Sequence, residues 1–152
     1  MNSPTIPNVL EIRPARKEDA AALARLADEL GHPTTPEEVA ARFSDALRQN
    51  NYALFVAELP SGELAGFMEL VVERLIDAEA RVEVAGLVVS KPFRGNGIGH
   101  TLMAHAEEWA ARRGCRIVHL RSNVKRAGAH AFYERLGYEH FKTQKAFRKH
   151  LK

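Results

Sequence analysis

Short apolar runs bounded by turn residues predict the strands of this chain. Residues 52–59 and 64–74 are rich in Val, Leu, Phe and Ala, and the Pro-Ser-Gly-Glu cluster at 60–63 between them is typical of a hairpin turn. Residues 80–89 first alternate charged and apolar positions and then become wholly apolar, which predicts a strand that passes from half exposed to buried. Three further extended segments are predicted at 8–13, at 116–121 and from 138 onward.

Apolar residues spaced three and four apart predict four helices. One of them has a clear start, because Thr35 and Glu38 form a capping box and Pro36 occupies the first helical position. The other three helices are predicted over 17–30, 97–113 and 126–136. A glycine follows each of these three, as is common at helix ends.

The predicted order is β, α, α, β, β, β, α, β, α, β. Strands alternate with helices only in the second half, so we expect an α/β protein of the α+β type with a mixed, mostly antiparallel sheet, flanking helices and one parallel crossover around the third helix. The 152 residues show no repeat and no linker, which predicts a single domain over 1–152.

Composition narrows the class of protein. With 45% hydrophobic and 27% charged residues, the chain has the balance of a globular protein. Its apolar runs are too short to cross a membrane, and residues 1–10 lack the basic and apolar regions of a secretory signal, so we expect a cytoplasmic protein with no membrane partner. Cys115 is the single cysteine, which excludes an internal disulfide, and no metal site is expected.

The net charge of +3 does not indicate a nucleic-acid partner. Residues 142–152 hold five basic residues and no acid, which leaves 17 basic against 19 acidic residues in the rest of the chain. A nucleic-acid surface needs a basic patch across the domain, and the main body is slightly acidic.

The segment LVVSKPFRGNGIGHTLM at 87–103 carries the clearest chemical signal. An apolar strand leads into three alternating glycines and then directly into a helix. Glycines let a ligand approach main-chain N–H groups, and a helix N-terminus with Arg94 beside it suits a pyrophosphate. The spacing fits neither the dinucleotide-binding nor the P-loop signature.

The pattern R-x-x-G-x-G at Arg94, Gly97 and Gly99 resembles that of the GCN5-related N-acetyltransferase (GNAT) family. The resemblance extends over nearly the whole chain, and the segment HAFYERLGY at 130–138 is similar to the family's second motif. It implies that the chain transfers an acetyl group from acetyl-CoA, bound as co-substrate, to an amine.

The resemblance also implies roles for individual residues. Tyr133 would lie near the thioester sulfur and protonate the leaving thiolate, and Asn123 would hold the pantetheine arm. Main-chain groups of three strand residues would face the pantetheine and the acetyl carbonyl, and the glycine turn would bind the pyrophosphate. The strand residues are Leu87, Val88 and Val89, and those of the turn are Arg94, Gly95, Asn96, Gly97, Ile98 and Gly99.

If the chain acetylates an amine, a base must take the proton of the ammonium, and we expect a strand carboxylate in this role. Glu83 lies shortly before the end of its strand, where it could act directly or through water, and Glu69 and Glu73 on the neighbouring strand are alternatives. Each also has a structural interpretation: Glu83 as a solvated carboxylate paired with Arg81, and Tyr133 as a core aromatic residue.

The acceptor amine leaves no specific motif. We expect a small-molecule primary amine bound beside the loop between the first two helices, where Glu29 and His32 are polar groups with no role in the core. Acetylation of a protein or peptide amine and a non-catalytic CoA-binding regulatory module stay open as alternatives, and so does a homodimer.

Overall fold

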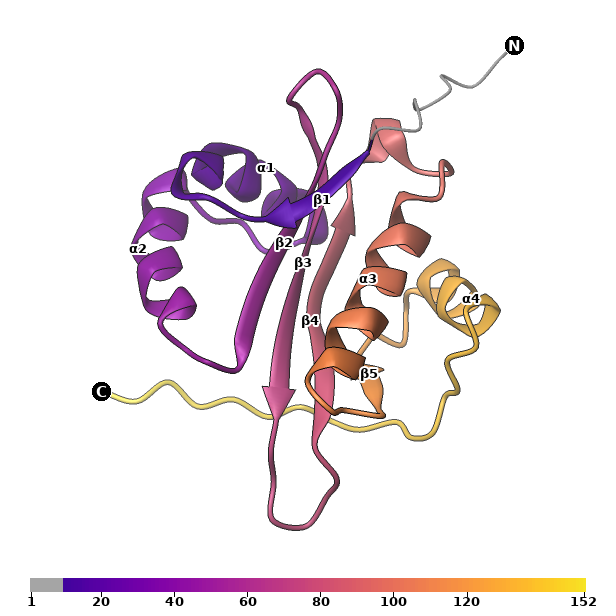
Figure 1. Ribbon diagram of the computed structural model, residues 1–152. Coiled ribbons are helices and arrows are strands. Elements are labelled where there is room, and N and C mark those ends of the chain that lie inside the picture. Colours follow the sequence, from indigo (N-terminus) through magenta and orange to yellow (C-terminus); the bar gives the residue numbers. More distant parts are fainter. Residues whose placement is uncertain (1–9) are drawn as a thin grey trace. The chain divides into compact units, whose positions relative to one another are not determined.

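The structure, a computed structural model, describes residues 10–152 (Figure 1). Its strands are β1 (Glu11–Pro14), β2 (Tyr52–Glu58), β3 (Leu64–Glu73), β4 (Arg81–Val89) and β5 (Val118–Leu120). Its helices are α1 (Ala20–Leu30), α2 (Pro36–Leu47), α3 (Ile98–Arg112) and α4 (Ala127–Arg135), with single 3₁₀ turns η1 (Lys17–Asp19) and η2 (Lys91–Phe93). None of the helices in the described part of the chain is long and apolar enough to span a membrane.

The chain forms two compact units. The first runs to Arg121 and contains the sheet with α1 to α3, and the second comprises residues 122–152 with α4. The single-domain organisation over 1–152 stays a prediction, and each unit is described separately.

The sheet of the first unit has the order β1-β2-β3-β4-β5. The first three pairings are antiparallel and β4 pairs with β5 in parallel, which confirms the predicted mixed sheet with one crossover through α3. Within the first unit, α1 and α2 lie on one side of the sheet and α3 on the other (Figure 1). On one face Leu23 and Leu26 of α1 pack with Leu54 and Val56 of β2, and on the other Phe55 makes an edge-to-face ring contact with a histidine of α3.

Two irregularities in β4 create the geometry of the site. The pairing with β3 shifts from Leu70↔Val84 to Glu69↔Gly86, so Ala85 is an extra residue in a β-bulge. The parallel pairing with β5 ends at Val84↔Leu120, and within residues 10–152 no residue of β4 beyond Val84 pairs with β5. The end of β4 is therefore open along one edge.

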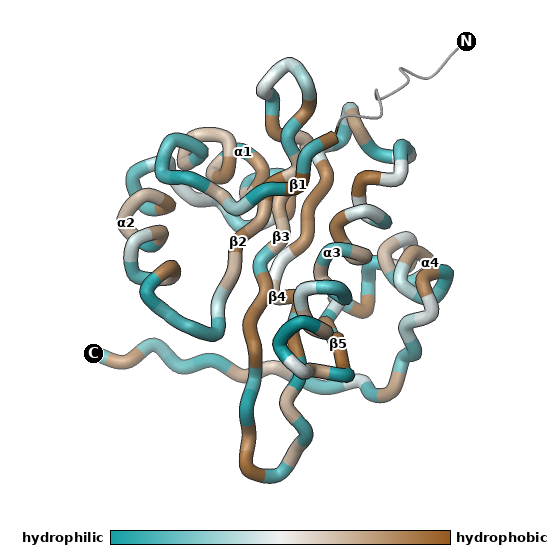
Figure 2. The backbone as a smooth tube through the Cα atoms, in the orientation of Figure 1, coloured by the Kyte–Doolittle hydropathy of each residue, from teal (hydrophilic) through white to brown (hydrophobic). Residues whose placement is uncertain are grey.

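The prediction of a final strand from residue 138 is wrong. Within the described residues no strand follows α4. The segment has Phe141, Phe147 and Leu151 exposed among basic residues, so neither side of it forms the continuous apolar face that a half-buried strand requires. Figure 2 shows this segment as mostly hydrophilic, in contrast to the hydrophobic stretches along β3 and β4. Of the strand predicted at 8–13, residues 8 and 9 lie outside the described part.

Candidate active site

The turn between β4 and α3 has the conformation of an anion cradle. Gly95 and Gly97 have φ angles of +83° and +80°, where residues with side chains are strained. A Cβ atom at either position would have no atom within 4 Å, so the backbone conformation and not crowding requires glycine here. Gly97 is the N-cap of α3 and no side chain caps this helix. Its first N–H groups are therefore available to an anion.

Hydrogen bonds within the turn fix its path. The Arg94 Nε donates to the carbonyl oxygen of Val89 at 2.9 Å, and the Asn96 amide donates to the carbonyl oxygen of Phe93 at 3.0 Å. The side chains of Val88 and Ile98 are buried in the core. These two residues can meet a ligand only through their main-chain groups, which for Val88 is the contact that the family resemblance implies.

Glu29 supports this turn and does not line the pocket that lies between α1, α2 and the sheet. Its carboxylate accepts hydrogen bonds from the Ser90 hydroxyl at 2.9 Å and the Lys91 N–H at 3.0 Å, which joins the end of α1 to the start of η2. The bond from the Lys91 N–H holds the pKa of Glu29 below its usual value. We therefore expect Glu29 to influence the cradle.

Replacing Glu29 by Ala should raise the KM for acetyl-CoA and leave the acceptor KM unchanged. The loss of two acceptors on the η2 turn should cost about 1 to 2 kcal/mol, roughly a 5- to 30-fold change. His32→Ala is the matched variant from the neighbouring loop and should raise only the acceptor KM. Steady-state kinetics with each substrate varied would test both variants, and a change of the acceptor KM alone in Glu29→Ala would place Glu29 at the acceptor.

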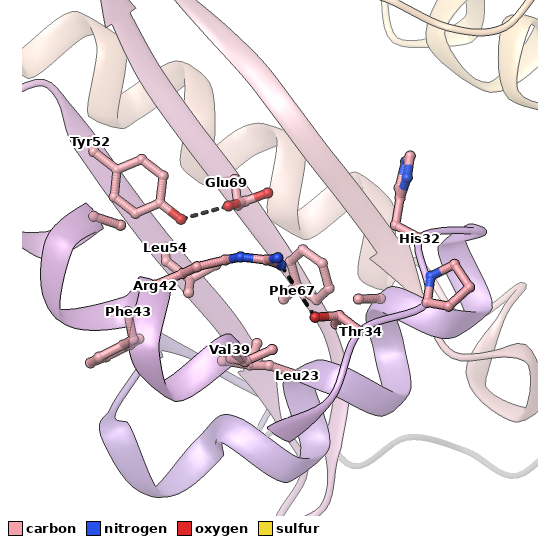
Figure 3. Close-up of a pocket in the computed structure, with 13 residues that line it drawn as sticks. Leu23, His32, Thr34, Val39, Arg42, Phe43, Tyr52, Leu54, Phe67 and Glu69 are labelled. Carbon is pink, nitrogen blue, oxygen red and sulfur yellow. Dashed lines mark hydrogen bonds between the residues drawn. The ribbon is translucent and has the colours of Figure 1, made fainter. Parts of the chain in front are cut away.

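A pocket of about 290 Å³ lies between α1, α2 and the sheet (Figure 3). Most of its lining is apolar. Its charged side chains are Arg42 of α2 and Glu69 of β3, and His32 lines it from the loop between α1 and α2. The complete lining is Leu23, Ala27, His32, Pro33, Thr34, Val39, Arg42, Phe43, Ala46, Tyr52, Leu54, Phe67 and Glu69.

Hydrogen bonds to neighbouring side chains fix two polar groups of the pocket, the Tyr52 hydroxyl and the Arg42 guanidinium. The Tyr52 hydroxyl donates to Glu69 at 2.6 Å, and the Arg42 guanidinium donates to the Thr34 hydroxyl at 3.3 Å and to the Glu38 carboxylate at 3.1 Å. Figure 3 shows the Arg42 side chain extending across the pocket toward Thr34 and the Tyr52 hydroxyl pointing to Glu69. Burial and the adjacent Glu69 carboxylate raise the pKa of Tyr52, so its hydroxyl stays protonated and keeps donating.

Glu69 connects the pocket with the bulge of β4. A Cβ atom on Gly86 would lie 3.0 Å from Oε2 of Glu69, so the absence of a side chain at position 86 leaves room for this carboxylate. Of the three carboxylates considered from the sequence, Glu69 is the one that lines the pocket.

Glu83 lies on β4 before the bulge, opposite His119 of β5. Its carboxylate lies 3.5 Å from the Arg121 guanidinium, and one of its oxygens lies within 4.8 Å of an oxygen of the Glu73 carboxylate. Burial, followed by the contact with Glu73, raises the pKa of Glu83 to about 7. Such a group can exchange a proton near neutral pH.

Tyr133 and Asn123 belong to the second unit. The Tyr133 ring makes edge-to-face contacts with Phe132 and Tyr138, at centroid distances of 5.1 and 6.2 Å, and burial raises its pKa. The Asn123 side-chain oxygen accepts the Lys125 N–H at 2.9 Å, and its carbonyl oxygen accepts the Arg126 N–H at 2.9 Å. Asn123 therefore organises the turn that leads into α4.

Comparison with known proteins decides the family. The sequence model of the acetyltransferase (GNAT) family matches residues 19–138. The chain belongs to the GNAT family. This GNAT protein is 36% identical over 146 residues to the aminoalkylphosphonate N-acetyltransferase of Salmonella typhimurium, covering 91% of this chain and 92% of the relative. It is accordingly an N-acetyltransferase.

Solved structures agree with the GNAT fold. An acetyltransferase of Trypanosoma brucei superposes with a TM-score of 0.77 at 26% identity, over 92% of this chain and 99% of that protein. An aminoglycoside N-acetyltransferase solved in complex with CoA superposes with a TM-score of 0.80 at 23% identity, over 93% and 95% of the two chains. At this identity the second likeness concerns the fold alone.

No motif in the sequence indicates that Arg42 and Tyr52 line one pocket. Arg42 follows Glu38 by four positions, which is the spacing of an ordinary surface ion pair on a helix, and the two residues do form that pair. Tyr52 begins a strand, where an aromatic residue is common. Only the packing of α2 over β2 and β3 brings these side chains to one pocket.

Proposed function

We propose that this GNAT protein uses acetyl-CoA to acetylate the primary amine of a small molecule that also carries an anionic group. The acceptor attacks the thioester directly in a ternary complex, without a covalent enzyme intermediate. The observation that carries this proposal is that one carboxylate, Glu69, and one guanidinium, Arg42, line an otherwise largely apolar pocket.

The two charges suit the two ends of such an acceptor. The Glu69 carboxylate attracts an ammonium group, and its place beside Gly86 puts that end near the open edge of β4. The Arg42 guanidinium attracts a phosphonate or carboxylate, and His32 adds a hydrogen-bonding group. The volume of about 290 Å³ is at the small end of the range for ligand pockets and favours a small molecule over a protein segment.

The similarity to the aminoalkylphosphonate N-acetyltransferase supports the same acceptor class. An aminoalkylphosphonate has an ammonium at one end and a dianionic group at the other, which is the charge pattern that the pocket complements. The identity of 36% extends over nearly the whole of both chains.

On the donor side, we propose that acetyl-CoA binds at the end of β4 and the start of α3. The pyrophosphate lies against the N–H groups of the turn Arg94–Gly99, where the dipole of α3 and the charge of Arg94 stabilise it. The pantetheine arm follows the open edge of β4, where main-chain groups of Leu87, Val88 and Val89 have no partner strand on the β5 side. Asn123 is the further residue that we assign to the pantetheine arm, on the resemblance of its segment to the family.

Proton transfer is the main chemical task of the protein groups. Glu69 orients the ammonium, and Glu83, which does not line the pocket, accepts its proton through water, leaving a neutral amine. The amine nitrogen then forms a bond with the acetyl carbon, the C–S bond breaks, and Tyr133 gives its proton to the thiolate. A main-chain N–H of β4 stabilises the carbonyl oxygen while it carries negative charge.

The anionic end of the acceptor is tested by Arg42→Gln. For 2-aminoethylphosphonate we expect kcat/KM to fall about 10- to 100-fold, the loss of one charge-assisted contact, and for n-propylamine less than about twofold. The matched control is Arg48→Gln at the end of α2, where Arg48 is exposed, pairs with Asp45 and does not line the pocket. Equal losses for both amines in Arg42→Gln would contradict an anion-binding role.

A further inference from the structure

Three titratable side chains meet on one face of the sheet, apart from the acceptor pocket. Glu73 of β3, Glu83 of β4 and His119 of β5 bring one atom each to within 4.8 Å of one another, and all three side chains are at least half buried. None of them lines the pocket. The strand register produces the cluster, because Glu83 lies opposite His119 and Glu73 lies opposite Arg81.

The charges around the two carboxylates are unequal. Glu73 has the closer cation, because the Arg81 guanidinium donates to its Oε2 at 2.9 Å. The His119 Nε2 lies 3.3 Å from the same oxygen without a hydrogen bond. Glu83 faces the Arg121 guanidinium at 3.5 Å, and that arginine is 74% exposed. Exposure to water weakens such a pair, so the ionised state is favoured more strongly on Glu73 than on Glu83.

We infer that Glu73 and Glu83 share one proton at neutral pH, and that Glu73 is the positioning residue which sets the pH at which Glu83 becomes able to accept the proton of the amine. Two half-buried carboxylates whose oxygens lie within 4.8 Å of each other repel when both are ionised, and one shared proton removes that repulsion. The inference rests on the proposed function in one respect, the role of Glu83 as the base.

The surroundings of Glu73, Glu83 and His119 determine which of these groups holds the proton. The contact with Glu83 and the Arg81 guanidinium hold the pKa of Glu73 below its usual value, while burial and the contact with Glu73 raise that of Glu83. Burial lowers the pKa of His119, which is therefore mostly neutral at pH 7 and adds little positive charge. Protonation of the pair consequently takes place on Glu83.

In each turnover the pair takes up one proton and releases one proton. Above the pH at which the shared proton leaves, the Glu83 carboxylate takes one proton from the ammonium and gives a carboxylic acid that donates a hydrogen bond to Glu73. After acetylation this proton returns to solvent. Below that pH Glu83 already holds the proton and cannot act as a base, so kcat/KM should decrease with decreasing pH along an acidic limb near pH 7.

The variant Glu73→Gln tests the inference, and the measured quantity is the pH of the acidic limb of kcat/KM. Removing the negative charge of Glu73 should make Glu83 a stronger acid, so the limb should move to lower pH by about one unit or more. Carbon NMR of the labelled Glu83 carboxyl should show its titration midpoint moving in the same direction without substrate. Glu73→Asp keeps the charge and should keep both values close to those of the wild type.

Glu79→Gln is the matched control, because Glu79 is paired with the exposed Arg116 and lies outside the cluster. It should change neither the limb nor the midpoint. An unmoved Glu83 midpoint in folded Glu73→Gln would overturn the shared proton. A moved midpoint with an unmoved limb would overturn the control of the base by Glu73. An acidic limb that persists in Glu83→Gln would instead overturn the assignment of Glu83 as base, independently of the pair.

Discussion

Replacing Gly97 by Val should abolish acetyl-CoA binding at the concentrations that saturate the wild type. Gly97 has a φ of +80°, where a β-branched residue is strongly strained, so the turn must change its path to accept Val. Such a change moves the N–H groups at the start of α3 away from the pyrophosphate. We expect the Kd for acetyl-CoA, measured by calorimetry, to rise about 100-fold or more, equivalent to at least about 2.7 kcal/mol.

Gly62→Val provides the matched control for this experiment. Gly62 lies in the turn between β2 and β3 with a φ of +90°, and a Cβ atom there also meets nothing within 4 Å. The two variants therefore carry a similar backbone strain and should lose a similar amount of stability. If both bind acetyl-CoA as the wild type does, the turn after β4 is not the pyrophosphate site.

Replacing Tyr133 by Phe should lower kcat by about 10- to 1000-fold, in the range measured for lost general acids and oxyanion donors. Phe keeps the ring and its edge-to-face contacts with Phe132 and Tyr138, so the packing around α4 should be preserved. Because burial raises the pKa of Tyr133, the hydroxyl stays protonated over the working pH range and can donate its proton to the thiolate.

Two further measurements serve as controls for the kcat of Tyr133→Phe. The Kd for acetyl-CoA and the thermal unfolding midpoint should stay close to the wild-type values, since only one oxygen atom is removed. A variant that turns over at the wild-type rate with its proper acceptor would show that Tyr133 is a packing residue, and the thiolate would then leave without this acid.

The order of the elements up to α4 followed from local signals in the sequence. The capping box of Thr35 and Glu38 is formed as expected, and Gly31 ends α1 in the left-handed conformation. The predicted strand after α4 failed because extended conformation needs a partner strand, and the residues from 138 onward lack a continuous apolar face. Local patterns specify an element well when its signals are internal to the element.

The proposed donor and acceptor sites also differ in how much of each can be recognised from local sequence signals. The cradle is built from consecutive residues, so its glycines and Arg94 were visible as a motif. The proposed acceptor pocket joins residues from α2, β2 and β3, and the shift of register at Ala85 places Glu69 beside Gly86. Such a shift depends on the pairing of two strands and has no signature in either strand alone. The sequence suggested Glu29 as an acceptor residue, and in the structure its carboxylate accepts hydrogen bonds from Ser90 and Lys91 at the start of η2.

The most direct test of the account combines the purified protein, acetyl-CoA and 2-aminoethylphosphonate. Thiol release and mass spectrometry measured on the same reaction should give one N-acetylated product for each CoA formed, with n-propylamine at least about 10-fold less efficient in kcat/KM. A peptide with a free N-terminus and a lysine should not react measurably. Binding of acetyl-CoA without thiol release from any amine would contradict the account and favour a regulatory module, and preferential acetylation of the peptide would contradict a small anionic amine as the acceptor.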